Sequence, residues 1–186
     1  MIVSFALTFV WMVVIFWLSA QVAEESNELS TGLTAKIADV IEQIAPEVDI
    51  DQTDLNHLVR KNGHFFSYLL LGLLVANSLR LSQRYAAGIV HQGEIDIKPT
   101  WAGRLASHLT ALSPWRLWFY VWIFCLLYAL SDELHQVFVP GRGCQIQDVL
   151  VDSAGAAVGT LLCLLVCRMA SRKKKRQPDE LFARQV

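Results

Sequence analysis

The chain has 186 residues and a formal net charge of −1; 54% of its residues are apolar and only 18% are charged. A soluble domain of this length would show short amphipathic periods, and this sequence shows long apolar blocks instead. The composition therefore argues for a membrane protein.

Four apolar blocks follow one another, at about residues 2–20, 64–82, 115–134 and 149–169. Each approaches the roughly 20 residues that a bilayer-spanning helix needs. The third is the shortest, and it reaches a full span only by including Leu134 or the aromatic pair Trp115 and Trp118. The first could be a cleaved signal peptide, but no Lys or Arg precedes it, so we predict a retained helix.

We therefore predict an all-α fold, an integral membrane four-helix bundle over residues 1–170, followed by a basic tail at 171–186. The loop 83–116 holds four basic residues and the segment from Arg168 holds seven, whereas 131–147 holds only Arg142. Since basic residues collect on the cytoplasmic side, we expect a multi-pass cell-membrane protein with both termini inside. The tail is most simply a topology anchor; attraction to anionic lipid is an added effect, and we expect no nucleic-acid partner.

The segment between the first two blocks is polar, but residues 33–45 place apolar side chains at helical spacing. We predict an amphipathic helix there, capped by Ser30 or Thr31 and ended by Pro46. An apolar stripe does not name its partner. The helix therefore either lies on the outer membrane surface or packs over the outer ends of the spans.

Polar residues gather at the predicted outer ends of all four spans, where ionisable groups are expensive and tend to mark functional sites. Lys61, His64 and Tyr68 stand at i, i+3 and i+7, so they share one helix face. The other members of this group are Ser19 and Gln21 after the first span; Ser131, Asp132, Glu133 and Gln136 at the end of the third; and Asp148 and Asp152 at the start of the fourth.

Two local patterns sharpen this picture. Asp148, Asp152, Gly155 and Gly159 form one helical stripe, and its two glycines predict a close backbone approach to a neighbouring helix. That contact would turn both Asp side chains into the bundle. Residues 140–143, PGRG, predict a tight turn with Arg142 at its tip.

The string SDELHQVFVPGRGCQIQDVLVDSAGAAVG at 131–159 strongly resembles the signature of the VanZ-like family of bacterial membrane proteins. FWLSAQVAEESNELS at 16–30 and RKNGHFFSYLLLG at 60–72 resemble two further blocks of that family, in the same order. The one departure is Ala20, where the family often shows a second Ser. The resemblance implies a role in the cell envelope and reduced sensitivity to the glycopeptide teicoplanin. The matching positions are Ser19, Gln21, Ser26, Ser30, Lys61, His64, Tyr68, Ser131, Asp132, Glu133, Gln136, Arg142, Asp148, Asp152 and Gly155.

Three interpretations of the polar group remain open. In a structural one, Arg142 pairs with Asp148 or Asp132, and Lys61 with Glu133. In a binding one, an outward-facing pocket uses Lys61 and Arg142 to hold the phosphate or carboxylate of a membrane lipid or lipid-linked envelope precursor.

In the third interpretation the protein is a small membrane enzyme, with Asp132, Glu133 or His64 as general acid or base. A metal held by His64, Asp132 and Asp152 lacks any HxxxH or HExxH spacing, so we predict no metal and no cofactor. Both a monomer and an oligomer are compatible with the sequence.

Overall fold

The computed structural model describes residues 1–44, 51–91, 107–108 and 110–183. Within these residues the fold is all-helical, with five helices: α1 (Ile2–Ser19), α2 (Ala23–Ile44), α3 (Gln52–His91), α5 (Pro114–Gln136) and α6 (Ile146–Ala183). Four stretches are long and apolar enough to cross a membrane: Ile2–Ser19, Gln52–Gly88, Pro114–Gln136 and Ile146–Arg172. The four predicted spans are thereby confirmed as helices.

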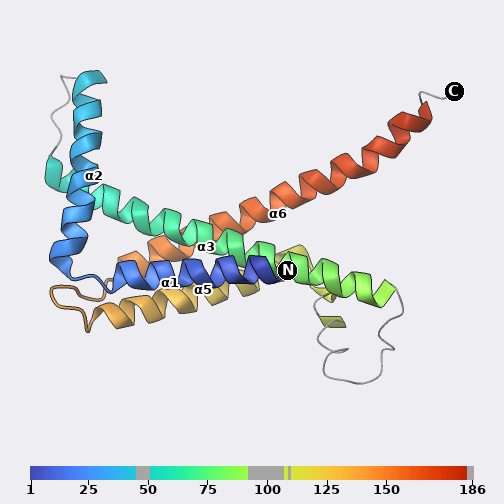
Figure 1. The fold of residues 1–186 in the computed structure, drawn as a ribbon, viewed down its shortest axis with the longest axis horizontal. Helices are drawn as coiled ribbons and strands as arrows, with labels where there is room; N and C mark the ends of the chain where they lie inside the picture. The colour runs from blue at the N-terminus through green and yellow to red at the C-terminus, as the bar shows by residue number, and fades with distance from the viewer. Residues whose placement is uncertain (45–50, 92–106, 109, 184–186) are drawn as a thin grey trace.

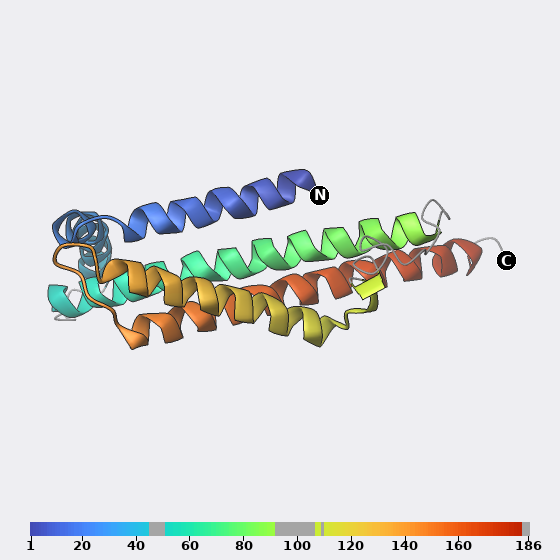
Figure 2. The same cartoon turned by 90° about the horizontal axis from the view of Figure 1, so that it is seen from below.

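The helices α1, α3, α5 and α6 run side by side, and α2 crosses them steeply at one end (Figures 1 and 2). At this α2 end, α1 and α5 finish and α3 and α6 begin. The other end, where α5 begins, lies near the N-terminus of α1, and α6 projects beyond it. The fold therefore brings the polar ends of all four spans together, as the sequence predicted.

Two helices are longer than their apolar blocks. The helix α3 begins at Gln52, twelve residues before His64, and the side chain of Asp51 caps it by accepting a 2.8 Å hydrogen bond from the Thr53 N–H. The helix α6 continues through the basic run to Ala183. Apolar length marks only the part of a helix that suits the bilayer, so our predicted span limits fell inside both helices.

The closest packing in the bundle lies between α3 and α6. A Cβ atom at Gly155 would overlap the Phe65 carbonyl, and one at Gly159 would overlap the Leu69 carbonyl. From the other side, a Cβ at Gly72 would meet the backbone of Ala156. The predicted glycine stripe is thus confirmed as a backbone-to-backbone contact, which small residues allow inside a membrane.

Several hydrogen bonds join the helix α1 to α3. The Ser78 hydroxyl lies 2.8 Å from the Ser4 hydroxyl and 3.1 Å from that of Thr8. Farther along, the indole N–H of Trp11 donates to the Ser67 carbonyl at 2.9 Å. Large apolar side chains of α1 point away from the protein, as expected for a helix that faces lipid on one side.

The amphipathic segment forms α2, which starts at Ala23 and not at the predicted Ser30 or Thr31. Those two residues lie inside the helix, so the predicted cap is wrong, and Pro46 falls outside the described residues. Buried Thr34 faces α3, where its hydroxyl donates to the Asn56 side chain at 3.3 Å. Packing over the end of a span is therefore present, and contact with the lipid surface stays a prediction.

Candidate functional site

An imidazole and a carboxylate meet where α3 and α6 pack closest. His64 Nδ1 lies 3.3 Å from Asp152 Oδ1, and Asp152 is completely buried. Gly155 follows Asp152 by one turn and lies against Phe65, the residue after His64. The glycine contact therefore fixes the spacing of the two backbones that carry the pair. When His64 is protonated this contact is an ion pair.

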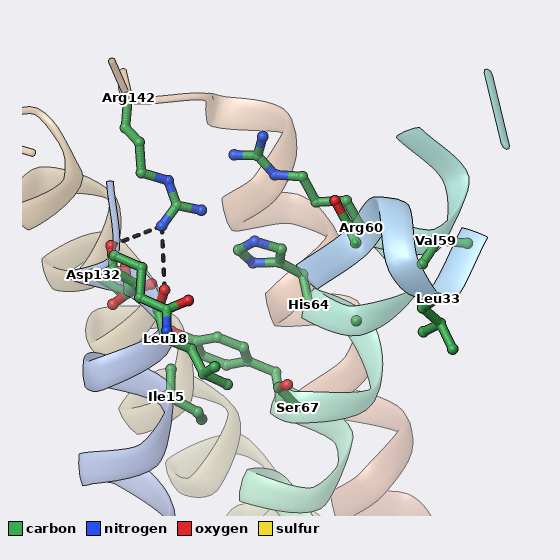
Figure 3. A pocket seen from close by; sticks show the side chains of 14 residues that line it. Ile15, Leu18, Leu33, Val59, Arg60, His64, Ser67, Asp132 and Arg142 are labelled. Carbon is green, nitrogen blue, oxygen red and sulfur yellow. Dashed lines mark hydrogen bonds between the residues drawn. The ribbon is translucent and has the colours of Figure 1, made fainter. Parts of the chain in front are cut away.

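His64 also lines a cavity of about 340 Å³ at the α2 end of the bundle (Figure 3). We call this space the His64 cavity. Its walls combine polar groups with aliphatic side chains from α1, α2 and α3. The described lining residues are Ile15, Leu18, Ser19, Gln21, Ser30, Leu33, Val59, Arg60, Gly63, His64, Ser67, Tyr68, Asp132 and Arg142.

Two guanidinium groups lie at the cavity from different elements: that of Arg60, from α3, lies over the His64 ring, and that of Arg142, from the loop 137–145, lies toward Asp132 and the end of α1 (Figure 3). Burial lowers the pKa of Arg142 below its ordinary value, and the positive charge of Arg60 lowers this pKa further, against the opposite effect of nearby carboxylates. Arginine stays protonated in proteins nonetheless. The cavity mouth therefore holds two like charges, an arrangement that favours an anion.

The Arg142 guanidinium binds backbone and not a carboxylate. One of its terminal nitrogens, Nη1, donates to the Ser19 carbonyl at 2.7 Å and lies 3.4 Å from the Leu18 carbonyl. Both carbonyls belong to the C-terminal turn of α1, where such oxygens lack partners within the helix. Among the described residues the predicted ion pair of Arg142 with Asp148 or Asp132 does not form, so that prediction is wrong.

The loop that carries Arg142 has the expected turn. Gly141 adopts a positive φ of 75°, which glycine tolerates without strain. The Arg142 N–H donates to the Val139 carbonyl at 3.1 Å, and the Gln145 N–H donates to Glu133 Oε2 at 2.8 Å. The first of these bonds closes a turn within the loop, and the second ties the end of the loop to α5.

The polar side chains at the end of α5 divide into two groups. Gln136 donates to Glu133 Oε1 at 3.1 Å and is 3.3 Å from Asp132 Oδ2. All three are buried, but only Asp132 also lines the His64 cavity. Glu133 lies behind the cavity with both oxygens hydrogen-bonded, so in this structure it orders the loop.

Tyr68 supplies the most buried polar group of the cavity lining, with 1% of its surface exposed. Its hydroxyl makes no hydrogen bond to any residue in the described part of the chain. Leaving such a group unpaired costs about 1–3 kcal/mol. A polar ligand group that reached this depth would remove that cost.

The remaining predicted residues lie away from the cavity. Lys61 donates to the Gln147 side chain at 3.1 Å, and the predicted pair of Lys61 with Glu133 does not form. Ser131 is exposed and donates to the Tyr128 carbonyl at 2.7 Å, and Asp148 is buried in the first turn of α6. Within the described ranges, no three His, Cys, Asp or Glu side chains are close enough to hold a metal ion.

Sequence reasoning missed Arg60, although a signal for it existed. Arg60 stands at i−4 from His64, so the two share a face of α3. The adjacent Lys61 drew attention because it also lies close to that face. Only the structure shows that Arg60 lines the cavity and Lys61 does not.

A family model, VanZ/LLP1, matches residues 4–167. The chain belongs to the VanZ/LLP1 family. The match includes the four candidate spans almost completely and every residue that lines the His64 cavity. Searches of curated proteins and of solved structures found no match. The protein is therefore a multi-pass membrane protein of the VanZ/LLP1 family, as the resemblance implied.

Proposed function

We propose that this protein binds the anionic headgroup of a lipid or lipid-linked envelope component in the His64 cavity. The observation that carries the proposal is the pair Arg60 and Arg142 above a cavity with aliphatic walls. Guanidinium groups bind phosphate and carboxylate with directed hydrogen bonds. An amphiphile matches this combination, since its charged group meets the arginines while its chain meets Ile15 and Leu33.

We further propose that the cavity opens on the outer face of the membrane, with both termini in the cytoplasm. The distribution of Lys and Arg supports this orientation. A membrane-impermeant maleimide added to intact cells should label the exposed Cys144 and no cysteine introduced at Arg172. Labelling of the Arg172→Cys position from outside would overturn the orientation.

The family resemblance supports an envelope role. Held at the outer face, a bound lipid-linked precursor would be less accessible to a glycopeptide. We therefore propose that the protein lowers teicoplanin sensitivity by this route. Cells that express it should tolerate more teicoplanin than cells without it.

Two neighbouring residues provide the sharpest test of binding. Arg60→Gln and Lys61→Gln remove the same charge from consecutive positions of α3, but only Arg60 lines the cavity. With the purified full chain and a polyprenyl phosphate as probe, Arg60→Gln should weaken binding about tenfold, the effect of about 1.4 kcal/mol. Lys61→Gln should bind as the parent does. Equal losses in the two variants would mean that general surface charge, and not the cavity, binds the probe.

A second function is favoured by the contact between His64 and Asp152. A carboxylate that holds one imidazole nitrogen orients the ring for general acid or base work, and Asp132 lines the same cavity. The protein would then be a small membrane enzyme acting on a headgroup. Catalysis requires that lipid or peptidoglycan-precursor profiles differ between cells with the parent and cells with Asp152→Asn at equal protein amount. Identical profiles would exclude catalysis, and binding would remain as the function.

A further inference from the structure

A second cavity lies between α5 and α6, toward the end of the bundle where α5 begins. Its volume is about 1000 Å³, and its lining is mainly aromatic and aliphatic. We call it the Trp118 groove. Along α6 its lining runs from Ala157 to Ser171, which places it away from the His64 cavity; the two linings share no residue.

The floor of the groove is held in place. The Trp118 indole N–H donates to the Ala157 carbonyl of α6 at 3.1 Å, and its ring stacks on Trp122 with centroids 5.9 Å apart. The side chains of Leu161 and Leu165, by contrast, are about half exposed. The groove is thus a fixed apolar surface that is left open along its length, the form that an acyl chain can fill.

Positive charge collects at the end of the groove. Arg80 from α3 and Arg168 from α6 both line it, and Arg80 Nε is buried with no hydrogen bond to a described residue. A smaller cavity of about 320 Å³ shares Arg80 and Pro114 with the groove and adds Arg84. Among the described residues that line either cavity, none is acidic.

The N-terminus of α5 adds to the positive electrostatic potential at this end of the groove. Pro114 is at the first position of the helix, and the Ser113 side chain makes no capping hydrogen bond. The first N–H groups of a helix attract anions. Basic pockets between spans on the cytoplasmic side are known to hold acidic lipid headgroups, since that leaflet carries the anionic lipids.

We infer that the Trp118 groove binds an anionic glycerophospholipid, with its phosphate between Arg80 and Arg168 and one acyl chain along Trp118, Leu161 and Leu165. This site is separate from the proposed function, because it lies at the other end of the bundle. Its ligand is a structural or regulatory lipid of the opposite leaflet. Binding depends on the groove alone and not on what occupies the His64 cavity.

The test compares two lipids that differ in headgroup only. Native mass spectrometry of the full chain in mild detergent measures adducts of dioleoyl phosphatidylglycerol and dioleoyl phosphatidylcholine. The parent should prefer the anionic lipid. The double variant Arg80→Gln/Arg168→Gln should lose about 25-fold in affinity for it, at roughly one factor of five per arginine.

The matched control is Arg116→Gln/Arg172→Gln. These arginines are exposed and lie toward the same end of the spans, but neither lines the groove. The control should keep the parental preference. An equal loss in both double variants, or a parent that binds the two lipids equally, would overturn the inference.

A variant with a larger side chain tests the position proposed for the acyl chain in the Trp118 groove. Leu161→Trp places a larger side chain at a half-exposed position, so the protein should still fold, and it should hold fewer molecules of the anionic lipid. The same spectra report dimers. If the parent is a dimer that Leu161→Trp dissociates while lipid adducts stay unchanged, a second copy and not a lipid occupies the groove, and the inference fails.

Discussion

The His64 cavity has one wall formed by α1, and it lies beside a tighter contact between α3 and α6. On one side, α3 and α6 meet through glycines, and their backbones touch at Gly155 and Gly159. On the other side, α1 is held by a few hydrogen bonds from side chains, such as that of Trp11 to Ser67. The contact between α3 and α6 positions the buried pair of His64 and Asp152, whereas α1 positions Arg142 over the cavity mouth.

The glycine contact leaves little freedom, because two touching backbones can move only together. The α1 side is more adjustable, since each of its hydrogen bonds in a membrane is worth on average about 0.6 kcal/mol. We conclude that the pair of His64 and Asp152 is the fixed part of the site. Arg142, whose partners Ser19 and Leu18 belong to α1, is bound to the more adjustable helix.

The largest expected effect comes from adding one methyl group to the glycine contact. Gly159→Ala places a Cβ against the Leu69 carbonyl, so α3 and α6 must separate. Overpacking of this kind costs about 1–3 kcal/mol. We expect a lower thermal transition and less folded protein, measured by size-exclusion chromatography of detergent extracts after heating.

The control is Gly88→Ala, at an exposed position of α3, where an added Cβ meets no atom within 4 Å. Alanine favours helix over glycine, so this variant should be as stable as the parent or more so. If Gly159→Ala were equally stable, the contact between α3 and α6 would not be the fixed part of the fold.

An intermediate effect is expected at the adjustable wall. Arg142→Lys keeps the charge but loses the planar group that contacts the Ser19 and Leu18 carbonyls. The protein should accumulate at the parental level, while affinity for a polyprenyl phosphate falls about tenfold. Teicoplanin tolerance should fall toward that of cells without the protein. Arg116→Lys, at an exposed position, is the control. If Arg142→Lys behaves like the parent, Arg142 is a solvated charge in the loop and does not bind the ligand.

The smallest effect is expected where α1 meets α3. Ser78→Ala removes the hydroxyl that contacts both Ser4 and Thr8, which should cost about 0.6 kcal/mol per hydrogen bond. Ser82→Ala is the comparison, because within the part of the chain that the structure describes that hydroxyl bonds to the backbone of its own helix, at the Ser78 carbonyl. Melting temperatures of the two variants should differ slightly, with Ser78→Ala the lower. The reverse order would contradict the role of the hydroxyl group in holding α1.

Much of the fold followed from the sequence because a bilayer imposes strict rules. Apolar length predicted four spanning helices, and the spacing of Gly155 and Gly159 predicted the close contact that the structure shows. The turn at 140–143 was predictable from its Pro and Gly residues, and Gly141 has the positive φ that glycine permits.

Other features depend on partners that spacing does not reveal. Arg142 has many acceptors within reach, so a nearby carboxylate seemed the natural choice, and only the position of α1 shows that its C-terminal carbonyls are closer. The start of α2 was missed because its first turns are polar and carry no apolar period. Arg60 and Lys61 have similar chemistry, and their roles separate only through the exact direction of each side chain.

The length of α3 has a consequence for access to the His64 cavity. Its 40 residues span about 60 Å, twice the roughly 30 Å of a hydrocarbon core. The apolar part of the helix starts just after His64, with Phe65 and Phe66, so a bilayer matched to that part has its headgroup layer level with the cavity. Under the proposed function, an amphiphile would enter sideways and leave its chain in the lipid. Its occupancy would then be set by how much of that amphiphile the membrane holds per unit area, and not by its concentration in water.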